Sequence, residues 1–199
     1  AMLRANNIPF ETGGHTGQLL KNDFLIVSPG MPSNMPIMLE AGQKRIPIFS
    51  EIEFASWVCQ GKICAITGSN GKTTTTTLIG EMINAGGKIA IVCGNIGKPF
   101  AEVADSITSD SIAVVEVSSY QLERTEEFRP KAALILNITP DHLDRYESFE
   151  HYKTTKYRIA ESQEHEDTLI VNADDAETCS DNIKTKAQKR FFTVNNEKK

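Results

Sequence analysis

Residues 63–82 read ICAITGSNGKTTTTTLIGEM, and they carry the clearest structural signal in the chain. An apolar segment leads into the loop GSNGKT at residues 68–73, and a helical segment follows it. Two glycines let a backbone curl so that successive amides point at phosphate oxygens, and the start of a helix adds partial positive charge. The order of strand, glycine loop and helix therefore predicts a polyphosphate-binding loop. Lys72 would reach the β- and γ-phosphates, and the Thr73 hydroxyl would ligate Mg²⁺.

This loop is shorter than the usual phosphate loop. The usual pattern places a glycine five positions before the second loop glycine, and Ile66 occupies that position here. The alternative is a plain Gly-Asn turn with Lys72 exposed. Five consecutive threonines at 73–77 argue against that turn, because β-branched residues are modest helix formers and a bound phosphate would hold such a first turn. The residues expected to contact the nucleotide are Gly68, Ser69, Asn70, Gly71, Lys72, Thr73 and Thr74.

Short β-branched runs alternate with helical segments along the rest of the chain. The runs predict strands at 24–27, 46–49, 62–67, 89–92, 112–117, 132–138, 168–171 and 190–193. Helical patterns cover 35–43, 72–85, 149–162 and 174–187. Near-continuous apolar strands between helices predict an α/β fold that contains the phosphate loop, with a mainly parallel sheet and helices on both faces. Such sheets bind ligands beyond the carboxyl ends of their strands, so the loops after the strands are the candidate site.

Composition excludes several classes of function. Of the 199 residues 40% are hydrophobic and 24% are charged, and the net charge is -5 with no Lys/Arg-rich stripe, which disfavours nucleic-acid binding. No apolar run approaches the roughly 20 residues that span a bilayer, and the first residues lack a secretory pattern, so we expect a cytoplasmic protein without membrane insertion. The four cysteines are scattered and form no CxxC pair, which predicts free thiols rather than a zinc site or disulfides. We expect small anions as partners.

Several motifs in order resemble the Mur ligases, which add amino acids to the peptidoglycan precursor. The short loop followed by TTTTTLIGEM is the first of them. The others are SPGMP at 28–32, GNIGKP at 94–99, EVSSYQLE at 116–123 and ILNITPDHLDRY at 135–146. The SSYQLE string favours the branch of this family that adds D-glutamate.

The resemblance implies a reaction and a domain order. ATP would phosphorylate the carboxylate of UDP-N-acetylmuramoyl-L-alanine, and the amine of D-glutamate would attack the acyl phosphate, with two Mg²⁺ ions cancelling the repulsion between anions. Residues 1–61 would be the end of a Rossmann-like, UDP-binding N-terminal domain, and residues 62–199 an incomplete central ATPase domain. The C-terminal amino-acid-binding domain would be absent. We therefore expect this chain alone to be inactive, and we expect it to be a monomer.

Three residues carry the expected metal and catalytic roles. Glu116 ends an apolar run at the carboxyl edge of a strand, where it is either a solvated carboxylate or, as the resemblance implies, an Mg²⁺ ligand with Thr73. His142 follows a strand, and it is either a structural residue at a helix start or, by resemblance, a ligand of the second Mg²⁺. Lys156 is by pattern an ordinary exposed helix lysine. The matching family lysine is carbamylated, which would turn a cation into an anionic oxygen ligand, and Lys153 is the nearby competitor.

The remaining expectations concern the muramoyl substrate. By resemblance Asn95 would hydrogen-bond it, although a turn-forming asparagine is an equal alternative. Ser118 and Gln121 would line the same cleft, and Ser28 and Gly30 would meet the UDP portion. Two rival functions stay open. One is a folylpolyglutamate synthase-like ligase, and the other is a module that binds nucleotide or the UDP precursor without turnover.

Overall fold

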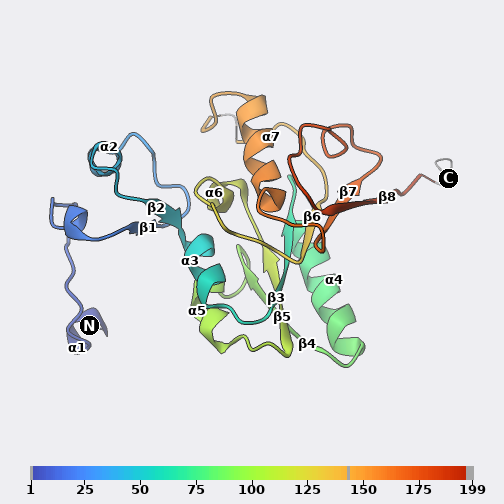
Figure 1. Ribbon diagram of the computed structural model, residues 1–199, viewed down its shortest axis with the longest axis horizontal. Coiled ribbons are helices and arrows are strands. Elements are labelled where there is room, and N and C mark those ends of the chain that lie inside the picture. The colour runs from blue at the N-terminus through green and yellow to red at the C-terminus, as the bar shows by residue number, and fades with distance from the viewer. Residues whose placement is uncertain (1, 143, 196–199) are drawn as a thin grey trace.

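Six parallel strands in the order β4-β5-β3-β6-β7-β8 form the main sheet of the computed structural model, which describes residues 2–142 and 144–195 (Figure 1). Because every pairing is parallel, the carboxyl ends of the strands lie at one edge of the sheet. The α/β prediction is confirmed. The strands are β3 (Lys62–Thr67), β4 (Ile89–Gly94), β5 (Ser111–Glu116), β6 (Ala132–Ile135), β7 (Thr168–Asn172) and β8 (Gln188–Phe192).

Helices cover both faces of this sheet. On one face α4 (Lys72–Ala85) packs its Ile79 and Ile83 against a cluster of Ile66, Val114 and Leu136. Gly80 lets α4 come close, because a Cβ there would lie 2.3 Å from Val92 Cγ2. The other face carries the larger core beneath α3 (Glu51–Val58), α5 (Phe100–Val103), η2 (Ala104–Ser106), α6 (Ser119–Leu122), α7 (Phe149–Tyr157) and η3 (Arg158–Ala160).

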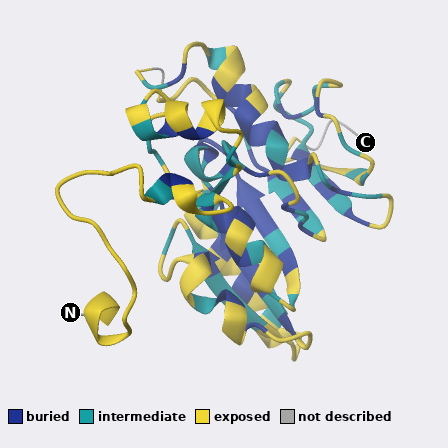
Figure 2. Ribbon diagram, turned by 60° about the vertical axis from the view of Figure 1, so that its left-hand side comes forward, coloured by how far each residue is buried: buried dark blue, intermediate teal, exposed yellow. Residues whose placement is uncertain are grey.

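Successive residues of a strand are buried on opposite faces of the sheet. Ala65 and Val115 belong to the larger core, while their neighbours Ile66 and Val114 belong to the cluster under α4. Figure 2 shows the middle of the sheet buried and the outer surfaces of the covering helices exposed. Side chains of a strand alternate between faces, so a strand covered on both sides is apolar throughout.

The N-terminal part forms a separate two-stranded parallel sheet from β1 (Leu25–Val27) and β2 (Ile48–Ser50). Its helices are α1 (Met2–Ala5), η1 (Leu19–Lys21) and α2 (Pro36–Gln43), and Figure 1 shows α1 well away from the main sheet. Helix α3 then joins this part to the main body, because Ile52 and Ala55 enter the larger core. The buried carboxylate of Glu53 accepts hydrogen bonds from the backbone N–H groups of residues 126–128.

The predicted helix at 174–187 is wrong. The structure has turns there, and side chains make local hydrogen bonds to nearby backbone groups. The Asp175 carboxylate accepts a hydrogen bond from the Glu177 N–H, and the Thr178 hydroxyl donates one to the carbonyl of Asn172. The helix expected at 149–162 ends as an α-helix at Tyr157, and the strand expected at 132–138 ends at Ile135. The short helices α5 and α6 were not predicted.

Candidate nucleotide and metal site

The loop between β3 and α4 has the shape expected of a phosphate cradle. Gly71 takes a left-handed conformation, with φ at 82°, directly before the first residue of α4. No side chain caps this helix start. The ammonium of Lys72 folds back over the loop and donates to the carbonyls of Gly68 and Ser69, each at 3.0 Å. A cation and a helix start therefore share one concave loop, which suits an anion.

The loop after β6 fixes the phosphate loop from one side. The Asn70 N–H donates to Asn137 Oδ1 at 2.8 Å, and Asn137 Nδ2 donates to the Asn70 carbonyl at 3.0 Å. Ser69 Oγ donates to the carbonyl of Thr139 and lies 3.1 Å from the Tyr152 hydroxyl. These side-chain bonds hold the loop while leaving the helix start free.

Glu116 lies at the mouth of the loop, at the end of β5. Its carboxylate is 2% exposed and accepts from Thr73 Oγ1 at 2.8 Å and from Asn95 Nδ2 at 2.9 Å. A Cβ at Gly94 would lie 2.3 Å from the Glu116 carbonyl, so only glycine permits this approach of β4 to β5. The structure thus brings together three of the residues singled out in the sequence.

The donors around Glu116 fit a magnesium ion. Mg²⁺ in proteins commonly takes one or two carboxylates and completes its shell with substrate phosphates and water. Glu116 and the Thr73 hydroxyl offer oxygen ligands of this kind, 2.8 Å apart. Across residues 2–142 and 144–195, no group of three or more His, Cys, Asp or Glu could hold a metal ion. A metal here would therefore depend on phosphate oxygens as well as protein ligands.

Lys156 is buried beside the phosphate loop, and the interpretation as an ordinary exposed lysine is wrong. Its side chain is 2% exposed, and Nζ donates to the Gly68 carbonyl at 3.0 Å. Burial, and next the nearby charge of Lys72, lower the pKa of Lys156 to about 7. Lys153 is held differently, because its ammonium pairs with Glu150 at 2.7 Å and Glu177 at 2.8 Å, which raises its pKa.

His142 lies in an aromatic corner near the same edge of the sheet. Its ring centroid is 5.2 Å from that of Tyr120 and 6.3 Å from that of Tyr152. The backbone of His142 has a φ of 52°, in the left-handed region that residues with a Cβ rarely adopt. Its Nε2 is 3.5 Å from a carboxylate oxygen of Asp141. Leu143, within the motif quoted above, lies outside the described residues.

The residues expected to contact the substrate make hydrogen bonds within the protein or line a small hollow. Ser118 and Gln121 form a capping box at the start of α6, in which Gln121 Oε1 accepts from the Ser118 N–H at 2.9 Å. Their side chains therefore have a structural task in this structure. Ser28 donates to Glu51 at 2.7 Å, and Gly30, with φ at 83°, lies with it at a small hollow that also includes Tyr120.

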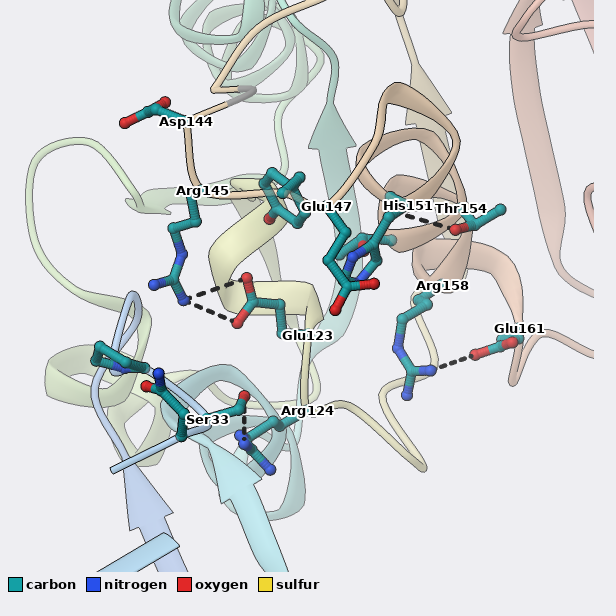
Figure 3. Close-up of a pocket in the computed structure, with 14 residues that line it drawn as sticks. Ser33, Glu123, Arg124, Asp144, Arg145, Glu147, His151, Thr154, Arg158 and Glu161 are labelled. Carbon is teal, nitrogen blue, oxygen red and sulfur yellow. Dashed lines mark hydrogen bonds and ion pairs between the residues drawn. The ribbon is translucent and has the colours of Figure 1, made fainter. Parts of the chain in front are cut away.

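A wide cavity lies away from the phosphate loop. It has a volume of about 860 Å³ and lies between residues 32–34 and helix α7, with Arg124, Arg145 and Arg158 on its walls (Figure 3). We give the loop edge more weight as a site, because its groups converge on one point.

Sequence reasoning missed three groups that shape the site. Asn137 and Tyr152 hold the phosphate loop, and Tyr120 lies against His142. Asn137 lies near the end of the strand predicted at 132–138 and within the quoted motif, and a polar residue in that apolar run was a usable signal. No local pattern marks the tyrosines.

The cysteines behave as expected of free thiols. All four are unpaired, and burial raises the pKa of Cys64 to about 11 and of Cys93 to about 12. Such thiols are mostly protonated at neutral pH and are poor nucleophiles.

Comparison with known proteins identifies relatives of this chain. The Mur ligase middle domain family matches residues 66–199. A protein of Chlorobium phaeobacteroides (strain DSM 266) named UDP-N-acetylmuramoylalanine–D-glutamate ligase is 48% identical over 180 residues, which are 88% of this chain and 39% of that protein. A Koribacter versatilis protein of the same name is 44% identical over 200 residues, covering 100% of this chain and 44% of the relative. The chain thus spans about two fifths of the length of these relatives.

Solved structures share the fold at lower identity. A UDP-N-acetylmuramate:L-alanyl-gamma-D-glutamyl-meso-diaminopimelate ligase from Neisseria meningitidis has a TM-score of 0.60 at 18% identity, covering 94% of this chain and 65% of that one. A MurF ligase from Thermotoga maritima in complex with ADP has a TM-score of 0.55 at 13% identity, covering 84% of this chain and 47% of that one. At these identities the likeness shows the fold alone.

Proposed function

The chain belongs to the Mur ligase family of ATP-dependent, amide-bond-forming enzymes, and from that premise we propose that it is the nucleotide-binding core of a D-glutamate-adding ligase. The complete enzyme would join D-glutamate to UDP-N-acetylmuramoyl-L-alanine during synthesis of the peptidoglycan precursor, in the cytoplasm. One observation carries this proposal. Glu116 is joined by hydrogen bonds to Thr73 of the phosphate loop and to Asn95, so the metal, nucleotide and substrate residues expected from the motifs meet at one point.

The physical task of the site is to bring two anions together. A triphosphate and a carboxylate repel each other, so catalysis of phosphoryl transfer depends on positioning and on cancelling charge. Residues 68–74 would hold the phosphates through backbone amides, and Lys72 would place a positive charge on them. Bound Mg²⁺ would supply further charge neutralisation, held by Thr73 and Glu116 and, at a second ion, by His142 and a carbamylated Lys156. The substrate carboxylate would take the γ-phosphoryl group with ADP as the leaving group. The D-glutamate amine would then attack the acyl phosphate, and phosphate and a proton would leave as the amide forms.

The environment of Lys156 supports its proposed carbamylation. Reaction with CO₂ requires the neutral amine, and a lysine of ordinary pKa is almost wholly protonated at neutral pH. Burial beside Lys72 lowers the pKa to about 7, so a large fraction of the amine is neutral near physiological pH. Carbamylation would also replace one of two adjacent cations by an anion.

The remaining assignments belong to the same proposal. Asn95, Ser118 and Gln121 would contact the muramoyl substrate, and Ser28 and Gly30 the UDP portion. Residues 1–61 would be the end of the UDP-binding domain and residues 62–199 part of the ATPase domain, although 196–199 lie outside the described residues. Recognition of D-glutamate would depend on parts of the complete enzyme beyond this chain.

Calorimetric titration of the chain with ATP and Mg²⁺, and separately with UDP-N-acetylmuramoyl-L-alanine, tests the proposal. We expect ATP binding that requires Mg²⁺ and that Glu116→Gln weakens. Glu81→Gln, a matched change of an exposed residue on α4, should leave it unchanged. The proposal is wrong if ATP fails to bind, or if a folate binds in place of the UDP precursor. Phosphate release measured alongside separates a module that only binds from an enzyme that turns over.

A further inference from the structure

Helix α6 and the loop that carries His142 are joined by a connected set of side chains. Arg145 Nη2 lies 3.2 and 3.4 Å from the two carboxylate oxygens of Glu123, at the end of α6 (Figure 3). The guanidinium carbon of Arg145 also lies 5.0 Å from the ring centroid of Tyr120. Both partners of the ion pair are largely buried, with side chains 24% and 19% exposed. A pair in this setting is fixed in space more firmly than one on an open surface.

The same set reaches His142 directly. Tyr120 has His142 as a neighbour, at 5.2 Å between ring centroids, and Tyr146 stacks on Tyr120 at 5.9 Å with an interplanar angle of 8°. The His142 carbonyl accepts hydrogen bonds from the N–H groups of Arg145 and Tyr146, at 3.0 and 3.2 Å. The left-handed backbone of His142 is disfavoured, so such a conformation persists only where surrounding contacts impose it.

Helix α6 connects these contacts to the end of β5. Glu116 is the last residue of β5, and α6 begins at Ser119, with the capping box of Ser118 and Gln121 fixing its start. One short rigid segment therefore carries Glu116 at its beginning and Tyr120 and Glu123 further on. A displacement of His142 relative to α6 would change the separation between Glu116 and His142.

We propose that Tyr120, Glu123 and Arg145 are positioning residues that hold His142 in place as a ligand of the second metal ion. This inference rests on the proposed function. Groups that orient a metal ligand without touching the metal change metal affinity by about 10–100-fold when they are removed. Removal of a salt bridge that served only stability would leave metal affinity unchanged.

Proton NMR of the histidine ring can test the proposal on the chain itself. The chain has four histidines, and the signal of His142 is identified by its loss in His142→Gln. The position of this signal is followed as Mg²⁺ is added at saturating ATP, and ATP affinity is measured separately by calorimetry. We expect Arg145→Gln and Tyr120→Leu to raise the Mg²⁺ concentration at half-response by about 10–100-fold while ATP affinity stays at the wild-type value.

Two variants serve as controls. Tyr120→Phe keeps the ring and should respond like the wild type. Glu161→Gln removes a partner of Arg158, 3.4 Å away on the wall of the same cavity, and should also have no effect. Thermal unfolding shows that each variant is folded.

The outcomes separate this inference from the proposed function. Absence of ATP binding by the wild type would overturn the proposed function and this inference with it. ATP binding with an equal half-response in the wild type and in Arg145→Gln would overturn the positioning roles alone. The same conclusion follows if Arg145→Gln lowers the unfolding temperature but leaves the Mg²⁺ response of His142 unchanged.

Discussion

The loops after β3 and β6 meet at the same edge of the sheet but are held in different ways. The loop after β3, residues 68–73, takes its backbone shape from its own glycines and from the helix that follows it, and distant side chains then hold that shape in place. The loop after β6, described at residues 136–142 and 144–147, is held by partners far away in the chain. Ile138 N–H donates to Asp175 at 2.7 Å, and Arg145 pairs with Glu123. A locally determined loop is visible in the sequence, whereas a loop held by distant partners becomes visible only after folding.

The difference also separates two tasks. The first loop offers charge and amides to a ligand, and the second keeps the first in place through Asn137 and Ser69. Changes in the first loop should therefore act mainly on ligand binding and catalysis, and changes in the second on stability and on the position of His142. Four substitutions test this division.

Lys72→Ala should have the largest effect. Loss of one preorganised electrostatic group at a reacting phosphate typically lowers the rate by about 10²–10³-fold. Phosphate release by an enzyme that contains this chain measures the effect. Lys88→Ala, an exposed lysine beyond the other end of α4, is the control and should leave the rate unchanged. A near-normal rate for Lys72→Ala would refute the role of this loop.

Lys156→Met should change the dependence of stability on pH. The pKa of Lys156 is about 7 in the folded protein and near 10.5 when unfolded, so the unfolded chain binds more protons between these values. Wild-type stability should therefore rise relative to Lys156→Met from pH 7 to pH 10, by up to roughly 1.4 kcal/mol per pH unit. Urea unfolding at pH 7.5 and 9.5 measures the difference, in CO₂-free buffer so that carbamate does not contribute. Equal pH dependence would show that Lys156 is not held as the structure has it.

Asn137→Ala should weaken the contact between the two loops. Two solvent-exposed hydrogen bonds to Asn70 are lost, each worth about 0.5–1.5 kcal/mol of stability. Chemical denaturation gives the value. The control is Asn84→Ala, which removes the side-chain acceptor of the Ala90 N–H at the far end of α4. Asn137→Ala should weaken nucleotide binding, and Asn84→Ala should leave it unchanged.

Gly71→Ala should have the smallest effect. Its φ of 82° disfavours a residue with a Cβ by roughly 1–2 kcal/mol, although the nearest atom to that Cβ, Leu136 Cδ1, is 3.8 Å away. Gly42→Ala in α2 meets nothing within 4 Å and has no positive φ, so it should stabilise the chain by about 0.4–1 kcal/mol. Thermal unfolding compares the two, and equal shifts would contradict the argument from conformation.

Much of the fold could be predicted because its signals are local. The helix over 72–85 and the strand over 62–67 were predicted with the bounds that the structure has. The helix predicted at 174–187 was wrong for the opposite reason. A helical pattern there competes with bonds from Asp175 and Thr178 side chains to backbone groups, and the tertiary position of Asp175 beside Ile138 favours the turns.

The strand–loop–helix unit, the α/β class and the family could all be predicted before folding was considered, because each depends on the order and spacing of residues along the chain. Only the tertiary structure decided that Lys156 is buried against Gly68, 88 positions away, and that Asn137 pairs with Asn70, 67 positions away. It also decided that Tyr120 lies against His142. The physical reason is that hydrophobic periodicity specifies which face of an element is buried but not which distant group it will meet.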